Sequence, residues 1–404
     1  MNYCFIISNA RLDYFNIQKV KKETSNVEFI LIYQKEGKSI PSEDFIGHMD
    51  HIFALNNITL ESCSEVIASF IDNSTKASIV CTDEIHLLTC ARLREKFKLR
   101  GARAYQYMRF LDKILMKQIL NINYIKVPKF MCVDFNYVGN FFEEYHQFIT
   151  SHLKVPYIIK PNDGGASESV AAINSSQDLI NWYKNNYQPD RVFEVEEYIT
   201  GDFFMCDSFV IDGKIIFCTP SQYIYPCLDF LSGKIMGLFP LPSQDPMFET
   251  IMKFNKRVVK ALQPPNGSLH MEFFIKNGKI TFIEIGARPP GKATCLLHEK
   301  NYNVNLYELT LRETLGLPIM LDVKENLYHG WFGFSTYPNK VNILHMPNLK
   351  SKLDLEWKIK VNDIISKFPL SINEGMSAEM VLYNPNFQEF MMDIETLKSF
   401  KPYS

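Results

Sequence analysis

The chain has 404 residues, of which 46% are hydrophobic, so it is long enough to form two or three lobes with their own cores. Its charged residues make up 22% and its net charge is −2, which gives no basic surface for nucleic acid or an anionic membrane. It shows neither the basic start of a signal peptide nor a run of about 18 apolar residues. We therefore expect a cytoplasmic protein without membrane or nucleic-acid partners.

The first hundred residues predict a small α/β domain with a parallel sheet, because short β-rich runs alternate with helical ones. No Gly-x-Gly-x-x-Gly motif is present, so a dinucleotide site of the Rossmann type has no support. Strands are expected at Tyr3–Ser8, Val27–Tyr33, His51–Leu55 and Ser78–Thr82, and helices near Ile17–Lys22 and Cys63–Ile71.

The carboxyl end of the fourth predicted strand carries Thr82, Asp83 and Glu84. Open α/β sheets place ligand groups at this edge, so one interpretation is that Glu84 contacts a substrate. The other interpretation is a plain helix N-terminus in which Thr82 or Asp83 is the cap.

The next segment predicts two helices, Ile85–Phe97 and Tyr105–Leu120. In the second helix an apolar stripe recurs at steps of three and four residues, which is typical of one buried face. The stripe consists of Met108, Leu111, Leu115 and Ile119. Lys113 and Lys117 share a different face, so both are expected to be exposed.

From Val155 the pattern favours antiparallel strands, with Asp212-Gly213 as a hairpin turn. Helix starts are expected at Ser176, at Asp245-Pro246 and at Asn305, and the last of these helices should end at Gly316. The strands are expected at Tyr157–Lys160, Val192–Glu196, Phe204–Ile211, Lys214–Cys218, Trp331–Phe334 and Met376–Tyr383, followed by a helix near Asn386–Leu397.

The hairpin Leu269–Ile285 carries two glutamates, and its register decides whether they share a face. With a two-residue loop, Glu272 would oppose Ile283 and Glu284 would face the other side. A three-residue loop Lys276–Gly278, with Gly278 left-handed in a bulge, would place both glutamates on one face and His270 opposite Glu284. The second register is favoured because the opposite face would then be wholly apolar. That face would consist of Met271, Phe273, Ile275, Ile283 and Ile285.

Two neighbouring carboxylates repel each other unless a cation lies between them, and hard oxygen ligands suit Mg²⁺ shared with phosphate oxygens. Glu272 and Glu284 are therefore candidate metal ligands; a solvated sheet face is the alternative. Arg288 follows in a Pro-Pro-Gly turn, from which its guanidinium could reach a phosphate or an oxyanion.

A second candidate region begins with Lys160, which ends a buried strand and so needs a counter-charge, for which phosphate is the natural choice. The turn after it, Asn162–Ser167, could direct backbone N–H groups at the same phosphates. Further on, the segment Glu196–Ile199 could hold a purine edge, although a plain acidic turn is equally compatible.

These segments, in this order, resemble the ATP-grasp superfamily, and most closely its carboxylate–amine ligase branch, which includes L-amino acid ligases. The matching motifs are Leu111-Asp112-Lys113, Ile158–Pro161 with Gly164–Ser167, Val195–Gly201, His270–Phe273 and Ile283–Arg288. The resemblance implies an α/β and α+β architecture, in which an N-terminal parallel α/β domain precedes two α+β lobes that clamp ATP. It divides the chain into residues 1–104, 105–200 and 201–404.

The resemblance also implies roles for individual residues. Lys113 and Lys160 would hold the ATP phosphates, and Glu272 and Glu284 would bind one or two Mg²⁺ ions, or Mn²⁺. Arg288, with Lys160, would stabilise the tetrahedral intermediate. The phosphate-covering loop would be Gly164, Gly165, Ala166 and Ser167, and the adenine contacts would be Glu196, Glu197, Tyr198 and Ile199. Contacts to the substrates would come from Glu84, His270, Gly291 and His298.

The chain departs from the family pattern at two positions. Gly286 stands where the family often has a metal-binding Asn, and Asp202 stands near the place of a ribose-binding Glu. The expected activity is ATP-dependent amide formation from a small carboxylate and an amine through an acyl phosphate, with release of ADP and phosphate. Modification of a peptide, activation of bicarbonate and nucleotide binding without catalysis remain as alternatives, and a homodimer stays open.

Overall fold

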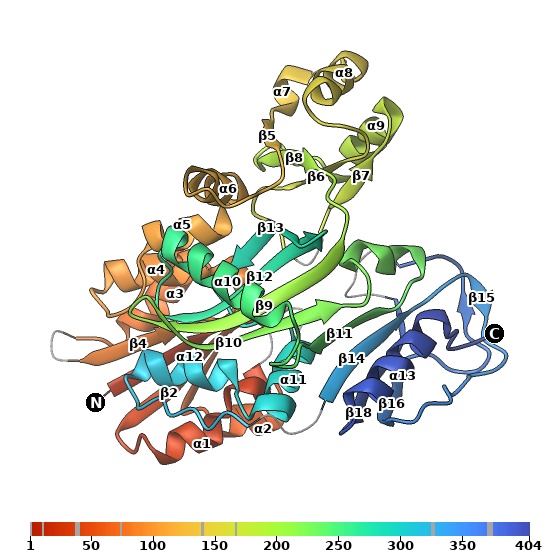
Figure 1. Cartoon of the computed structure of the whole chain (residues 1–404). Coiled ribbons are helices and arrows are strands. Elements are labelled where there is room, and N and C mark those ends of the chain that lie inside the picture. The colour runs from red at the N-terminus through yellow and green to blue at the C-terminus, as the bar shows by residue number, and fades with distance from the viewer. Residues whose placement is uncertain are drawn as a thin grey trace.

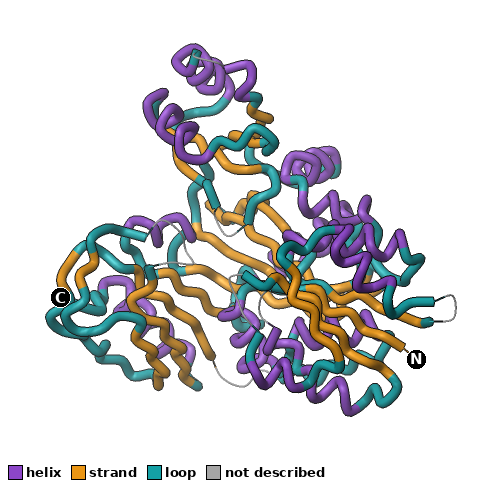
Figure 2. The backbone as a smooth tube through the Cα atoms, turned by 180° about the vertical axis from the view of Figure 1, so that it is seen from behind, coloured by secondary structure: helices purple, strands orange, loops and turns teal. Residues whose placement is uncertain are grey.

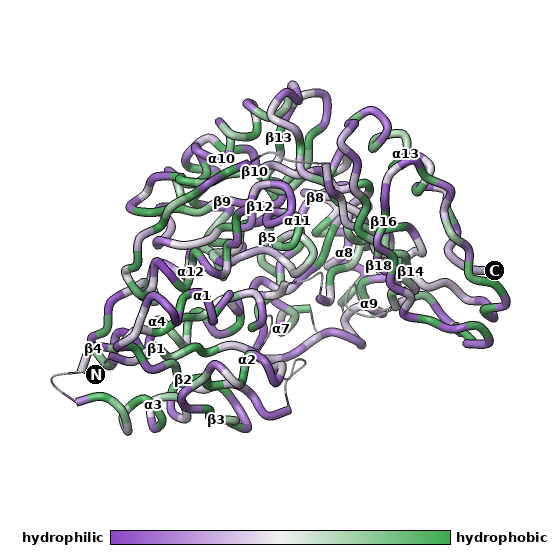
Figure 3. The backbone as a smooth tube through the Cα atoms, turned by 90° about the horizontal axis from the view of Figure 1, so that it is seen from below, coloured by the Kyte–Doolittle hydropathy of each residue, from purple (hydrophilic) through white to green (hydrophobic). Residues whose placement is uncertain are grey.

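The computed structural model describes residues 2–9, 12–36, 41–72, 75–138, 141–165, 168–324, 328–369 and 375–404. An N-terminal α/β part lies beside a large sheet, and a small lobe projects from them (Figure 1). Seen from below, hydrophobic and hydrophilic stretches alternate along most elements, as expected where each element buries one side (Figure 3).

The N-terminal part is built on a parallel sheet of four strands in the order β3-β2-β1-β4, which confirms the predicted architecture. Alternate residues of β1 enter two different cores: Phe5 and Ile7 pack on one face, and Cys4 and Ile6 on the other. Helices therefore cover both faces (Figure 2). The strands are β1 (Asn2–Ile7), β2 (Val27–Gln34), β3 (His51–Leu55) and β4 (Lys76–Val80). The helices are η1 (Leu12–Phe15), α1 (Ile17–Lys22), α2 (Glu43–Gly47), α3 (Leu60–Ala68), η2 (Glu84–His86) and α4 (Leu87–Lys96).

The predicted helix Tyr105–Leu120 is wrong, because the chain breaks into α5 (Ala104–Leu111) and α6 (Lys113–Ile122). Asp112 leaves the helical conformation, with φ −94° and ψ 103°, and its side chain caps α6 by accepting from the backbone N of Leu115 at 2.9 Å. The break turns a different face of α6 inward. The expected stripe is therefore also wrong: Met108 is exposed, whereas Lys113 and Lys117 are buried.

The small lobe carries an antiparallel sheet in the order β5-β8-β6-β7, and side chains alternate across it. One face, with Tyr157 and Val195, packs into the core of the lobe, so that Lys160 and Glu196 lie on the other face. The strands are β5 (Phe130–Val133), β6 (Tyr157–Pro161), β7 (Ala171–Ile173) and β8 (Phe193–Glu197). The helices are α7 (Phe135–Val138), α8 (Phe142–His152) and α9 (Ser176–Asn186), and α9 is capped by Ser175 rather than Ser176.

The large sheet has eight antiparallel strands in the order β13-β12-β9-β10-β11-β14-β18-β16. Helix α10 (Phe248–Leu262) covers one face and α11 (Lys292–Tyr302) the other. The strands are β9 (Asp202–Ile211), β10 (Lys214–Tyr223), β11 (Met236–Pro240), β12 (Gly267–Lys276), β13 (Lys279–Gly286), β14 (Tyr328–Ser335), β16 (Lys352–Trp357) and β18 (Met376–Asn384). The remaining elements are η3 (Cys227–Ser232), α13 (Phe387–Ser399) and the short pair β15 (Asn339–Lys340) and β17 (Ile364–Ile365).

Helix α12 (Leu306–Leu315) joins the two sheets, since it contacts both β4 and β12. Asn305 caps it and Gly316, with φ 70°, ends it, as predicted.

The predicted start of α10 at Asp245-Pro246 is wrong. The N-cap of α10 is Met247, and the side chain of Asp245 accepts a hydrogen bond from the backbone N of Met247. No helix in the described part of the chain is both long and apolar enough to cross a bilayer.

Candidate active site

The hairpin β12–β13 turns through two residues, because Lys276 pairs with Lys279. Asn277 has φ 51° and Gly278 has φ 71°, and a positive φ at both positions is typical of a type I′ turn. The predicted three-residue loop is therefore wrong. Without a further irregularity, this loop would place the two glutamates on opposite faces.

A bulge farther along the hairpin restores their common face. Phe273 pairs with Phe282, but Glu272 pairs with Glu284, so Ile283 is an extra residue on β13. The two glutamates thus lie directly opposite each other. His270 opposes Gly286 rather than Glu284, and Ile283 lines a cavity instead of joining the apolar face, so both of these expectations are wrong.

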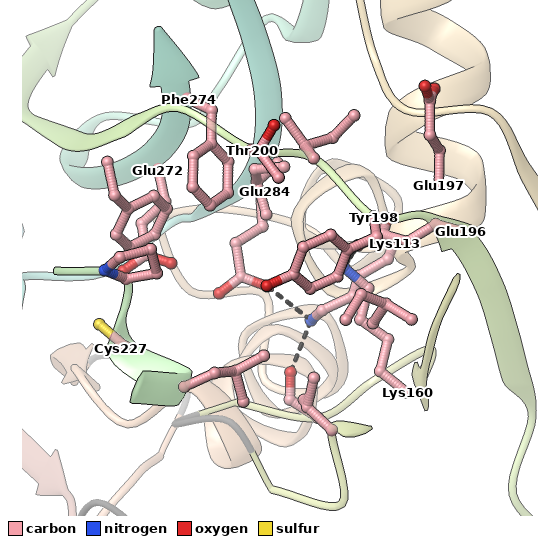
Figure 4. Close-up of a pocket in the computed structure, with 18 of the residues that line it drawn as sticks. Lys113, Lys160, Glu196, Glu197, Tyr198, Thr200, Cys227, Glu272, Phe274 and Glu284 are labelled. Atoms are coloured by element: carbon pink, nitrogen blue, oxygen red, sulfur yellow. Dashed lines mark hydrogen bonds and ion pairs between the residues drawn. The ribbon is translucent and has the colours of Figure 1, made fainter. Parts of the chain in front are cut away.

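The cavity, of about 270 Å³, lies between the small lobe and the large sheet (Figure 4). Residues far apart in the sequence meet there, because the face of β6 and β8 that carries Lys160 and Glu196 lies opposite β12 and β13. The predicted site residues that line it are Lys113, Lys160, Gly164, Gly165, Glu196, Glu197, Tyr198, Ile199, Glu272 and Glu284. Ala166 and Ser167 lie outside the described residues.

Glu284 lies among positive charges. Lys113 Nζ is 3.4 Å from Glu284 Oε2, and it donates to the carbonyl oxygen of Gly164 at 2.5 Å. Burial alone would raise the pKa of Glu284, but Lys113, Lys160 and Arg288 more than offset this effect and lower that pKa to about 2. The carboxylate is therefore ionised at neutral pH.

Glu272 is the end of a buried polar chain. Its Oε1 lies 3.4 Å from the hydroxyl of Tyr223 and 3.5 Å from His270 Nε2. His270 Nδ1 in turn lies 2.7 Å from Asp207 Oδ1, across the β9–β12 ladder. His298 Nε2 approaches Asp207 Oδ2 to 3.1 Å from helix α11, although the two atoms are not aligned as a hydrogen bond. This polar network links β12 to β9 and places His270 between two carboxylates.

The two glutamates fit a divalent cation that also binds a ligand. In the described part of the chain, no group of three or more His, Cys, Asp or Glu side chains is placed to hold a metal. Two facing carboxylates supply only part of a Mg²⁺ coordination shell, which suits an ion that completes its shell with phosphate oxygens and water. Lys113 lies beside Glu284, so its ammonium could contact the same phosphate oxygens.

Lys160 has a carboxylate of the protein as a counter-charge. Its Nζ lies 2.5 Å from Glu196 Oε1. Lys117, which is completely buried, contacts Glu194 Oε1 at 2.6 Å and Glu196 Oε2 at a shorter distance. Burial alone would lower the pKa of Lys160, but Glu196 and Glu194 more than offset this effect and raise it. The same lysines keep the pKa of Glu196 low against the opposing effect of burial.

The remaining walls of the cavity are largely apolar. Tyr198 and Ile199 line the side formed by the small lobe, and Glu197 points away from Lys113 and Lys160 (Figure 4). The opposite wall comes from residues that sequence reasoning did not assign to the site. They are Phe203, Phe274, Ile283, Pro226, Cys227, Leu228 and Asp229. Phe203 and Phe274 are neighbours on paired strands, with ring centroids 4.7 Å apart. The lining residues from η3 belong to no motif that the sequence analysis identified.

Arg288 lies outside the cavity lining and pairs with Glu84 of the N-terminal part, with Nε 2.6 Å from Oε2. A Cβ at Gly165 or at Gly286 would lie 3.6 Å from that same Glu84 oxygen, so both glycines border the pair. Burial alone would lower the pKa of Arg288, but Glu84 and Glu284 raise it.

The structure places the other predicted site residues as follows. His298 is a buried residue of α11, Gly291 is the N-cap of that helix, and His270 lies between Asp207 and Glu272. None of the three lines the cavity. Asp202 is exposed on β9 and also stays outside the lining.

Comparison with known proteins shows similarity to proteins with an ATP-grasp domain. Residues 153–295 match the model of the ATP-grasp domain. An L-arginine-specific L-amino acid ligase of Bacillus subtilis is 26% identical over 301 residues, which cover 72% of this chain and 70% of that protein.

Two solved structures match nearly the whole chain. An L-amino acid ligase from Bacillus licheniformis has a TM-score of 0.73 at 15% identity, over 98% of this chain and 97% of that one. A biotin carboxylase domain from Hydrogenobacter thermophilus, solved with MgADP, ADP and bicarbonate, has a TM-score of 0.65 at 14% identity, over 98% and 90%. At these identities the likeness establishes the fold.

Proposed function

Because the chain belongs to the ATP-grasp superfamily, we propose that it is an ATP-dependent ligase that joins a carboxylate to an amine, with amino acids as the substrate class. The fold is the one that the sequence motifs predicted. The observation that carries the proposal is the arrangement of the cavity. Glu272 and Glu284 face each other there, beside Lys113 and Lys160.

ATP would lie along this cavity. Its adenine would occupy the apolar part formed by Tyr198, Ile199, Phe203 and Phe274, because flat aromatic and aliphatic walls suit a purine. Its phosphates would point toward Lys113, whose ammonium already lies close to the backbone of Gly164. Glu272 and Glu284 would hold Mg²⁺, which supplies charge neutralisation on the phosphates when it is bound.

The reaction would proceed in two balanced steps. A carboxylate oxygen of the first substrate attacks the γ-phosphorus of ATP, the bond to the bridging oxygen breaks, and ADP leaves. The amine nitrogen of the second substrate then attacks the carbonyl carbon of the acyl phosphate, loses a proton, and expels phosphate. The lysines would bind the phosphoryl oxygens, and the guanidinium of Arg288 would stabilise the negative charge of the tetrahedral intermediate.

The substrate region would be the edge where Arg288 meets Glu84. A carboxylate there can pair with a substrate ammonium group, and a guanidinium can pair with a substrate carboxylate or acyl phosphate. Both charges of an α-amino acid would then find a partner. The 26% identical relative is named as a ligase for L-arginine, which supports an amino acid as one of the two substrates.

The test is a screen of phosphate release from ATP and Mg²⁺ with each of the 20 common amino acids, alone and in pairs, together with mass spectrometry of the products. We expect phosphate release that depends on an amino acid, with formation of an amide. Release that requires bicarbonate or a peptide would indicate one of the alternative ligases. Binding of ATP without turnover under all of these conditions would overturn the proposal in favour of a nucleotide-binding protein.

A further inference from the structure

We propose that Lys117 and Glu194 are positioning residues that free Lys160 to bind the nucleotide phosphates. The inference rests on the proposed function, because it assumes that ATP binds in the cavity. Lys117 and Glu194 do not line the cavity, whereas Lys160 and Glu196 do. A role for the first pair must therefore act through the second.

The four side chains form one buried ionic cluster. Lys117 and Glu194 are completely buried, and Glu196 and Lys160 are 3% and 5% exposed. Glu196 is held from both sides, since Lys117 contacts its Oε2 and Lys160 contacts its Oε1 at 2.5 Å. Lys117 also lies 2.6 Å from Glu194 Oε1, and Lys160 lies 3.7 Å from the same atom. Two ammonium groups thus balance two carboxylates.

The two lysines differ in where they can move. Lys160 lies at the cavity wall and can turn its ammonium toward a phosphate, but doing so removes one partner from Glu196. A buried carboxylate without a partner is strongly unfavourable, so Lys160 can move only if another cation stays beside Glu196. Lys117 is that cation. It keeps contact with Glu196 while Lys160 is engaged by the ligand.

Glu194 has the complementary role for Lys117. Its Oε1 holds the Lys117 ammonium, while its Oε2 has no hydrogen-bond partner among the described residues. Without Glu194, Lys117 would depend on Glu196 alone. Lys113 shows the contrast: it contacts a backbone carbonyl and Glu284 and is not held by this cluster.

The experiment measures the Kd of ATP with Mg²⁺ by calorimetry in a set of charge variants. In Lys117→Met, Lys160 is the one lysine of the four-residue cluster that remains beside Glu196 and Glu194, so we expect ATP to bind at least about tenfold more weakly. Lys117→Arg, which keeps a cation beside Glu196 and Glu194, should bind ATP to within about threefold of the wild type.

Two further proteins separate this effect from loss of folding. Lys117→Met with Glu194→Gln keeps the buried cluster neutral, so it should fold yet bind ATP as weakly as Lys117→Met, because Glu196 still holds Lys160. Lys184→Met, which changes an exposed lysine of α9, should bind ATP as the wild type does.

The outcomes decide the inference. Wild-type affinity in Lys117→Met, or in the charge-neutral double variant if the single variant does not fold, would overturn it. So would a Lys117→Arg protein that folds but binds ATP as weakly as Lys117→Met. Failure of the wild-type protein to bind ATP would instead refute the proposed function, and the two results are therefore distinguishable.

Discussion

Single residues decide whether the cavity can hold a cation. Glu272 and Glu284 are opposite partners on neighbouring strands, and each is held by groups of its own: Lys113 beside one, and His270 with Tyr223 beside the other. Partly buried carboxylates on directly opposed residues repel each other unless positive charge lies between them. The chemistry at this scale therefore depends on charge, and charge variants test it.

Glu284→Gln keeps the shape of the side chain but removes the charge that a cation requires. We expect turnover to fall by about 100-fold or more, because transition-state charge loses its stabilisation, while the fold is retained. Steady-state phosphate release and thermal unfolding would measure the two properties. Glu356→Gln, on β16 at the far edge of the same sheet, is the matched control and should be fully active. Full activity in Glu284→Gln would exclude a metal role for this residue.

The raised pKa of His270 predicts that the stability of the protein without metal and nucleotide depends on pH. Burial alone would lower its pKa, but Asp207 and Glu272 raise it to about 9, above the ordinary value of 6.5. The folded state thus binds a proton that the unfolded state releases. The stabilisation is complete below pH 6.5 and is lost as the pH rises to about 9, by at most about 1.4 kcal/mol per pH unit.

Urea unfolding at pH 6 to 9 would measure this slope as the difference between the wild type and His270→Gln. The variant lacks the titrating group, so its free energy of unfolding should change less over that interval. An equal pH dependence in both proteins would show that His270 is not protonated between the two carboxylates.

At the scale of elements, the hairpin β12–β13 places the metal candidates through two irregularities: a two-residue turn at one end and the Ile283 bulge in the middle. Sequence reasoning found the glutamates and their common face, but it assigned the bulge to the loop. The composition could not separate these cases, because a bulge at either place puts both glutamates on one side. The shared face is confirmed; the register is not.

The turn predicts a stability difference between two glycines. A Cβ would meet no atom within 4 Å at Gly278 or at Gly47, but only Gly278 has a left-handed φ, of 71°. Gly278→Ala should therefore lower the free energy of unfolding by about 1 kcal/mol, whereas Gly47→Ala, in α2, should not lower it. Chemical denaturation would measure both. Equal effects in the two variants would contradict a type I′ turn.

The same scale explains why the lysines of α6 were misjudged. A continuous helix would turn Lys113 and Lys117 to solvent, but the break at Asp112 rotates α6 and buries them. Asp112 and Lys113 belong to one of the family motifs, but the motif alone did not indicate that Asp112 caps a new helix. The family resemblance assigned Lys113 to the site, and nothing in the local pattern could assign Lys117.

At the scale of the molecule, the site is assembled from parts far apart in sequence. Glu84 of the N-terminal part pairs with Arg288 after β13, and α12 holds the two sheets together. The order of motifs predicted the fold and ten of the residues that line the cavity. It could not predict which distant residues touch, because the Glu84–Arg288 contact depends on how the two sheets pack.

The contact predicts a selective effect of Glu84→Gln. The variant removes the charge that would pair with a substrate ammonium but leaves the ATP cavity intact, so the KM for the amino acid should rise about tenfold while the KM for ATP stays constant. Steady-state kinetics with each substrate varied in turn would measure both constants. An equal rise in the two KM values would show that Glu84 acts on the packing of the parts instead.

The central claim is that a substrate carboxylate is activated as an acyl phosphate. The most direct test uses an amino acid in which both carboxylate oxygens are ¹⁸O, incubated with ATP, Mg²⁺ and the amine, with mass spectrometry of the released phosphate. The account predicts one ¹⁸O atom in each phosphate, because the oxygen that attacks the γ-phosphorus leaves with it. Amide formation with unlabelled phosphate would contradict it.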